Sequence, residues 1–309
     1  MDRTIIVGYD GSDRARDALA LGALLARTSG AQLIAAHVYI APATVERGEE
    51  VARVLTQEAE RKLADVRALA DDPAPELVVQ PGRSTAEGLY RLAEERGAEI
   101  IVVGSSSHGA LGRVLVGSGP EQLLHGAPCA IAVAPAGYAD AGTHALATIG
   151  VGYDGAPESR EALAAAVELG RAAGATVHAI SVLRPNPGIY IPAPMAASAY
   201  QDYIDAVHDS ESRDVRDAVV QLDGSGVDVV VETPGGLPPQ YLAEHSHEYD
   251  LLVLGSRAYG PLRRVLLGSV STHLIRHAAC PLLVLPRGAA LDADEMSRPT
   301  QTTADARLS

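Results

Sequence analysis

Short apolar runs alternate with longer amphipathic stretches along the whole chain. In the first half, apolar runs rich in Val, Ile and Ala begin near residues 5, 32, 76, 99 and 129. Amphipathic stretches at 13–30, 49–70 and 84–96 lie between them. Short β-branched runs indicate buried strands, and an apolar period near 3.6 indicates helices that cover them. The pattern therefore predicts a regular alternation of strand and helix.

The second half of the chain repeats the first. Residues 100–119, IIVVGSSSHGALGRVLVGSG, match residues 251–270, LLVLGSRAYGPLRRVLLGSV, at an offset of 151 residues. Residues 4–39 match residues 148–183 at an offset of 144, so the second copy has gained seven residues between these blocks. A repeat of this length indicates two whole domains, because solenoid repeats are only about 20 to 50 residues long.

The alternation also predicts the fold class. Strands joined by helices form a parallel sheet with right-handed crossovers. We expect an α/β protein with two tandem doubly wound, Rossmann-like domains, each with a five-stranded parallel sheet flanked by helices. The predicted boundaries are 1–137 for the first domain, 138–147 for a linker, 148–287 for the second domain and 288–309 for a flexible tail.

The extra length of the second copy lies mostly at 183–203, LRPNPGIYIPAPMAASAYQDY. Its prolines argue against a regular helix. We expect this segment to be either a flap over a site or a packing surface.

Composition narrows the choice of partners and compartment. The formal net charge of −14 argues against nucleic acid or an anionic membrane as a partner, since either needs a basic face. The N-terminus enters a strand directly, and no apolar run approaches the ~18 to 20 residues of a membrane span. Cys129 and Cys280 occupy equivalent repeat positions, and we expect them to be structural thiols in a soluble, cytoplasmic protein.

The Gly-rich blocks are the candidate sites. Ligands of doubly wound domains bind beyond the carboxyl ends of the strands, where Asp154, Val182 and Gly255 stand in the second copy. The run GSVS at 268–271 opens a helix whose first N–H groups are free, and its serines add hydroxyl groups. A glycine at the strand end would let the backbone approach a ligand closely. Together these features predict a phosphate site.

The blocks differ from other nucleotide motifs. There is no G-x-x-x-x-G-K-[ST] sequence, so the lysine of a P-loop is missing, and no G-x-G-x-x-G follows the first strand. A dinucleotide oxidoreductase is therefore not expected.

In these residues the chain resembles the universal stress protein family, in its tandem form with two domains in one polypeptide. The family motif is G-x2-G-x9-G-[ST] after the fourth strand, with an Asp near the end of the first strand. The closing segments HGAPCAIAVAP and RHAACPLLVLP also match, and the resemblance covers about residues 3 to 287.

The resemblance implies that each half could hold one ATP, with or without Mg²⁺. Members that bind ATP place the adenine against the end of the second strand, the ribose near the Asp and the phosphates over the Gly-rich loop. The implied residues are Asp154, Val182, Gly255, Ala258, Gly268, Ser269, Val270 and Ser271 in the second copy, and Asp10, Val38, Gly104, Ser107, Gly117 and Ser118 in the first.

Both copies depart from the motif. Its second glycine is replaced by Ser107 in one copy and by Ala258 in the other, which costs about 1 to 2 kcal/mol if that residue needs a positive φ. In the first copy Pro120 also replaces the residue equivalent to Ser271, removing a backbone donor and a hydroxyl. We therefore expect the second domain to be the better nucleotide site.

Several alternatives stay open. Asp10 and Asp154 each precede a glycine and could contact a ligand or only fix the turn. The leading hypothesis is a non-enzymatic ATP-binding stress or signalling protein without catalytic residues or a metal site. The alternatives are a nucleotide-free interaction scaffold and a slow ATPase or adenylyl transferase. The resemblance also implies that the last strands pair the two copies as an internal pseudo-dimer, which we expect to associate further into a homodimer.

Overall fold

The fold was analysed in a computed structural model of the chain. The structure describes residues 3–40, 48–70, 72–105, 126–142, 145–184, 196–222, 226–256, 265 and 267–286. Ser107, Gly117, Ser118, Pro120, Ala258 and the predicted tail lie outside these residues.

The first half alternates strand and helix as the sequence predicts. Its elements are β1 (Thr4–Gly8), α1 (Asp13–Ser29), β2 (Gln32–Ile40), α2 (Gly48–Leu63), α3 (Val66–Leu69), β3 (Glu76–Gly82), α4 (Thr85–Arg96), β4 (Ile100–Gly104) and β5 (Ala130–Ala134). The helix expected over 49–70 is divided into α2 and α3.

The second half repeats this order after a short 3-10 helix, η2 (Ala139–Ala141). Its elements are β6 (Thr148–Gly152), α6 (Pro157–Ala173), β7 (Thr176–Ile180), α7 (Ala196–Gln221), β8 (Val229–Glu232), α8 (Pro238–Glu244), η3 (Ser246–Glu248), β9 (Leu251–Gly255), α9 (Ser269–His277) and β10 (Leu282–Leu285).

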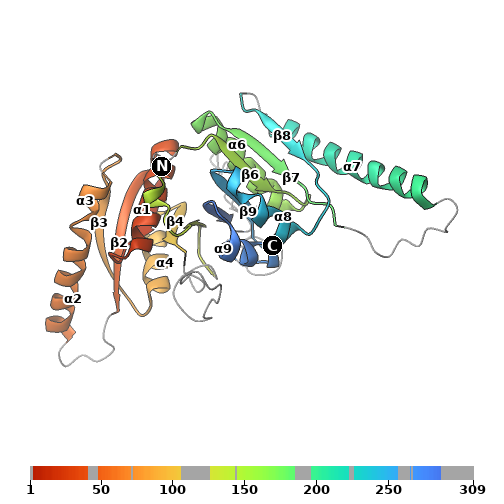
Figure 1. Ribbon diagram of the computed structural model, residues 1–309. Helices are drawn as coiled ribbons and strands as arrows, with labels where there is room; N and C mark the ends of the chain where they lie inside the picture. Colours follow the sequence, from red (N-terminus) through yellow and green to blue (C-terminus); the bar gives the residue numbers. More distant parts are fainter. Residues whose placement is uncertain are drawn as a thin grey trace, which may run out of the picture.

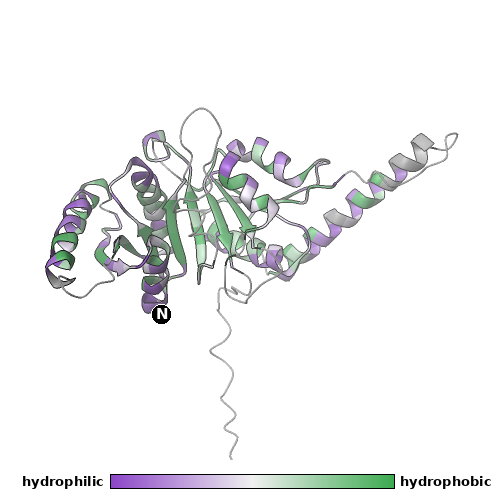
Figure 2. Cartoon of the chain, turned by 90° about the horizontal axis from the view of Figure 1, so that it is seen from below, coloured by the Kyte–Doolittle hydropathy of each residue, from purple (hydrophilic) through white to green (hydrophobic). Residues whose placement is uncertain are grey.

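Helix α7 corrects one expectation about the 183–203 segment. The helix begins at Ala196, so the last eight residues of that segment are helical. The prolines all lie at or before Pro194, and the sequence from Ala196 onward contains none to interrupt the helix. Figure 2 shows α7 extending well beyond the rest of the second half.

The two halves share one sheet of ten strands (Figure 1). Its order is β3-β2-β1-β4-β5-β10-β9-β6-β7-β8, and the five strands within each half are parallel. The join is antiparallel, with Ala132 of β5 opposite Leu283 of β10. The predicted pairing of the last strands within one chain is therefore confirmed, and it covers an apolar edge of each half-sheet.

The core lies on both faces of this sheet. Ile5 and Val7 belong to one buried cluster and Ile6 to another, because successive strand side chains point to opposite faces. Each cluster contains residues from both halves, so the apolar core continues across the join. Figure 2 shows these apolar strands between the flanking helices.

The segment that joins the halves is attached to the first domain. Asp17 of α1 is 4% exposed, and its carboxylate accepts hydrogen bonds from the backbone N–H groups of Gly137 (3.0 Å) and Ala139 (2.8 Å). A buried carboxylate needs such donors to offset its lost hydration. In addition, Arg3 of the first half lies 2.7 Å from Glu168 of α6.

In the described part of the chain, no helix has the length and apolar content that crossing a membrane requires.

The two cysteine thiols offer a test of this packing. Cys129 and Cys280 are free and buried, and burial raises the pKa of each thiol to about 12. At pH 8 the reactive thiolate is therefore scarce. We expect native protein to react with iodoacetamide about a hundredfold more slowly than protein unfolded in guanidinium, as measured by mass spectrometry. Similar rates in the two states would contradict the buried positions.

Candidate functional site

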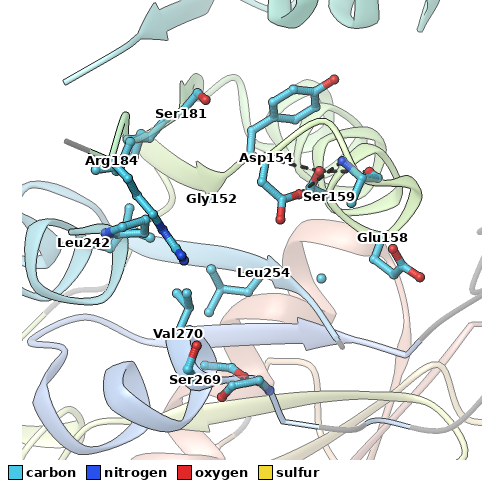
Figure 3. Close-up of a pocket in the computed structure, with 18 of the residues that line it drawn as sticks. Gly152, Asp154, Glu158, Ser159, Ser181, Arg184, Leu242, Leu254, Ser269 and Val270 are labelled. Atoms are coloured by element: carbon cyan, nitrogen blue, oxygen red, sulfur yellow. Dashed lines mark hydrogen bonds between the residues drawn. The ribbon is translucent and has the colours of Figure 1, made fainter. Parts of the chain in front are cut away.

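The second domain contains a cavity of about 620 Å³ at the carboxyl ends of its strands. Residues from the ends of β6, β7 and β9 and from the first turns of α6, α8 and α9 line it (Figure 3). This is the edge at which doubly wound domains bind ligands, and the volume lies in the range of small-molecule sites, roughly 300 to 1,000 Å³.

The structure brings most of the second-copy candidates together around this cavity. Those that line it are Asp154, Val182, Gly255, Gly268, Ser269, Val270 and Ser271. Ala258, the remaining candidate of this copy, lies outside the described residues. Candidates that are far apart in the sequence thus lie on one concave surface.

Asp154 forms a turn with the residues that follow it. Its Oδ1 accepts a hydrogen bond from the backbone N–H of Ala156 (3.1 Å), which is an Asx turn. The residue is exposed, and Figure 3 shows its carboxylate directed toward the cavity. Asp154 can therefore both fix the turn and contact a ligand. One carboxylate oxygen fixes the turn, and the other has no hydrogen-bond partner among the described residues.

Gly255 has a packing role in addition to the one expected from its place at the strand end. A Cβ at this position would lie 2.5 Å from the backbone oxygen of Glu158 in α6, a distance that real side chains do not tolerate. The glycine therefore lets the first turn of α6 pack on the end of β9, and its role in the approach of a ligand stays a prediction. Gly104 stands in the same relation to the backbone oxygen of Arg14 in α1, at 2.2 Å.

Gly268 leaves open space at the beginning of α9. A Cβ there would approach only the Ser271 Oγ, at 3.9 Å, and the φ of −86° suits any residue. Packing within the described residues therefore does not require glycine at this position. The first intrahelical bond runs from Thr272 N–H to Gly268 O, so the N–H groups of Ser269, Val270 and Ser271 have no intrahelical acceptor.

Ser271 differs from its predicted role as a hydroxyl donor to phosphate. Its Oγ accepts a hydrogen bond from Gly268 N–H (2.9 Å) and donates one to Gly268 O (3.2 Å). The side chain is 2% exposed and caps the helix from within. Only its backbone N–H is left for a ligand.

Ser256 is a cavity residue that the sequence pattern did not reveal. Its side chain is 7% exposed, and its Oγ has no hydrogen-bond partner among the described residues. Leaving a buried hydroxyl unsatisfied costs about 1 to 3 kcal/mol. A ligand that reaches the end of β9 could remove this cost. Its position directly after a buried strand was the available signal.

Arg184 is a second residue that the motif analysis missed. It follows β7 and lines the cavity, and Figure 3 shows its side chain extending inward toward Leu242 and Leu254. Those leucines and Val182 give this side of the cavity an apolar wall. Nothing in the Gly-rich pattern indicated a cation here, because the residue lies directly after the other repeated block, far from the Gly-rich segment in sequence.

Tyr153 completes the wall near α6. Its hydroxyl lies 3.4 Å from Asp214 Oδ2, and Arg160 lies 3.7 Å from the other carboxylate oxygen of Asp214. Burial and the nearby Asp214 carboxylate raise the pKa of Tyr153, so the phenol stays protonated at neutral pH. It can serve as a hydrogen-bonding group but not as an ionised base.

The first domain shows only part of the corresponding site. Asp10 Oδ1 accepts hydrogen bonds from both the backbone N–H (3.0 Å) and the hydroxyl (2.5 Å) of Ser12. Burial raises the pKa of Asp10, but these hydrogen bonds outweigh it and hold the pKa below its ordinary value. The Val38 side chain packs against Gly88 of α4, where a Cβ would lie 2.5 Å from it. The rest of the Gly-rich loop lies outside the described residues.

Two matched substitutions separate packing from ligand space. Gly255→Ala should lower the free energy of unfolding by about 2 kcal/mol, since its methyl meets backbone that cannot move alone. Gly268→Ala should change it by less than about 0.5 kcal/mol, because a weaker N-cap is offset by lower entropy of the unfolded chain. Denaturant titration of both variants measures this, and equal destabilisation would contradict the distinction.

The comparisons with known proteins agree with this architecture. The model of the universal stress protein family matches residues 1–135 and 146–286. A universal stress protein of Mycobacterium tuberculosis is 29% identical over 300 residues, which cover 92% of this chain and 99% of that protein.

Two solved structures extend the comparison. The crystal structure of a universal stress protein from Archaeoglobus fulgidus matches 92% of this chain and 98% of its own, with a TM-score of 0.66 at 18% identity, and so shares the fold. A universal stress protein crystallised in complex with cAMP matches 46% of this chain and 97% of its own, with a TM-score of 0.32 at 25% identity. With both halves matched by the family model, the chain belongs to the universal stress protein family.

Proposed function

We propose that this protein binds ATP in the second-domain cavity and uses nucleotide occupancy as a non-enzymatic signal in a stress response. The observation that carries the proposal is the cavity itself. It combines the free N–H groups of α9, the unsatisfied hydroxyl of Ser256 and an apolar wall at the carboxyl edge of a parallel sheet. A nucleotide matches this combination, with a flat base at one end and anionic oxygens at the other.

Each part of a nucleotide has a counterpart among the lining residues. The base would lie against Val182 and Leu242, and the ribose hydroxyls would donate to Asp154. The phosphates would accept hydrogen bonds from the N–H groups of Ser269 and Val270, where the helix dipole favours negative charge. Gly268 leaves the approach to these donors open.

The proposal assigns no catalytic residue. Phosphoryl transfer needs a positioned metal ion and a group that orients the nucleophile. In the described part of the chain, no three His, Cys, Asp or Glu side chains are grouped so as to hold a metal ion. Mg²⁺ bound only through the nucleotide remains compatible with the proposal, and binding should therefore be measured with and without it.

The second domain is proposed as the stronger site. Asp154 gives one oxygen to a single N–H, whereas Asp10 also accepts the Ser12 hydroxyl, for which the second copy has Ala156. One nucleotide per chain is therefore the expected stoichiometry. Association of two chains into a homodimer stays a prediction.

Calorimetric titration with ATP, ADP, AMP and cAMP tests this proposal, cAMP being included because one solved family member is complexed with it. We expect ATP to bind at one site per chain. Gly268→Asp should reduce ATP affinity at least about a hundredfold, because it places a carboxylate beside the phosphates. Gly268→Asn should lose far less, since it has the same shape and is also a good N-cap without the charge.

The outcomes separate the alternatives. No heat and no thermal shift with any nucleotide would contradict the proposal and favour a nucleotide-free scaffold. Equal affinity of the Asp and Asn variants would place the nucleotide elsewhere. Multiple-turnover ATP hydrolysis that disappears in Asp154→Asn would contradict the non-enzymatic assignment.

A further inference from the structure

The second-domain cavity has an unusual balance of charge. Among its described lining residues, Asp154 and Glu158 are acidic, and Arg184 is the one cation. Without that arginine, the positive charge that the described lining residues offer a phosphate would be the partial charge of a helix terminus, roughly half an elementary charge, beside the Asp154 carboxylate. Among these described residues, Arg184 is therefore the side chain whose charge favours an anion in the cavity.

Arg184 is also free to act on a ligand. It makes no ion pair or hydrogen bond with any described residue, and Figure 3 shows its guanidinium group in the open space of the cavity. Such an arginine can bind phosphate oxygens through two parallel N–H groups. It supplies the full positive charge that the missing P-loop lysine would otherwise provide.

The first copy has no counterpart to this residue. The offset of 144 residues places Ile40 at the position equivalent to Arg184, and Ile40 is 54% exposed. An isoleucine offers neither charge nor hydrogen bonds. The difference lies outside the Gly-rich loops, so it distinguishes the two domains independently of Pro120.

We propose that Arg184 is a specificity-determining residue that makes the second-domain cavity select nucleotides by their number of phosphates. This inference rests on the proposed nucleotide binding. Each added phosphate brings negative charge toward a cavity in which Arg184 is the cation among the described lining residues. Affinity should therefore rise from adenosine through AMP and ADP to ATP, and this rise should depend on the arginine.

Four full-length proteins test the inference by calorimetry with adenosine, AMP, ADP and ATP. Arg184→Ile installs the residue of the first copy, and Arg184→Lys keeps the charge but loses the bidentate geometry. Arg171→Gln removes one exposed charge in the last turn of α6, away from the cavity, and controls for the change in net charge. The wild type completes the set.

We expect Arg184→Ile to weaken ATP binding about tenfold and adenosine binding less than about twofold. The affinity of Arg184→Lys should lie between that of Arg184→Ile and the wild type, and Arg171→Gln should match the wild type. Raising the salt concentration should weaken ATP binding more in the wild type than in Arg184→Ile, because screening acts on the charge pair.

Two results would overturn the inference. Unchanged ATP affinity in Arg184→Ile would show that the arginine does not contact phosphate. Equal losses for adenosine and ATP would show that it stacks on the base instead. In both cases the wild type still binds nucleotide and the proposed function stands. If the wild type binds none of the four ligands, the proposed function and this inference fail together.

Discussion

The close packing of α6 on the end of β9 sets the geometry of the second domain. The backbone oxygen of Glu158 occupies the space that a side chain at residue 255 would need, so only glycine allows the contact. The contact fixes the first turn of α6, and with it the turn at Asp154, beside the strand end that carries Ser256. The same contact between α1 and Gly104 recurs in the first domain. The cavity is thus a consequence of how tightly helix and sheet approach each other.

The two domains share this backbone packing but differ in the side chains at the carboxyl ends of their strands. Their antiparallel join through β5 and β10 makes one sheet and one continuous core, which the two halves share. The copies differ at the carboxyl edge of the sheet, where the second-domain cavity lies. There the second copy has Arg184 in place of Ile40 and Ala156 in place of Ser12. The two copies therefore share the packing of helix on strand end but differ in the side chains beside the cavity.

Much of the fold could be predicted from the sequence, because strand and helix periods are local. The apolar run that begins near residue 32 coincides with the start of β2, and the amphipathic stretch at 13–30 agrees with α1 to within one residue. The packing role of Gly255 and the capping role of Ser271 could not be predicted for the opposite reason: both depend on contacts across a turn or between elements that no local pattern encodes. Arg184 and Ser256 were missed because a motif marks backbone shape, not every side chain facing the cavity.

A crystal structure grown with ATP would show whether the second-domain cavity holds a nucleotide. We expect electron density for the nucleotide in this cavity, with phosphate oxygens within hydrogen-bond distance of the Ser269 and Val270 N–H groups and of the Arg184 guanidinium. An empty second-domain cavity at saturating ATP, or nucleotide bound only in the first domain, would contradict this expectation.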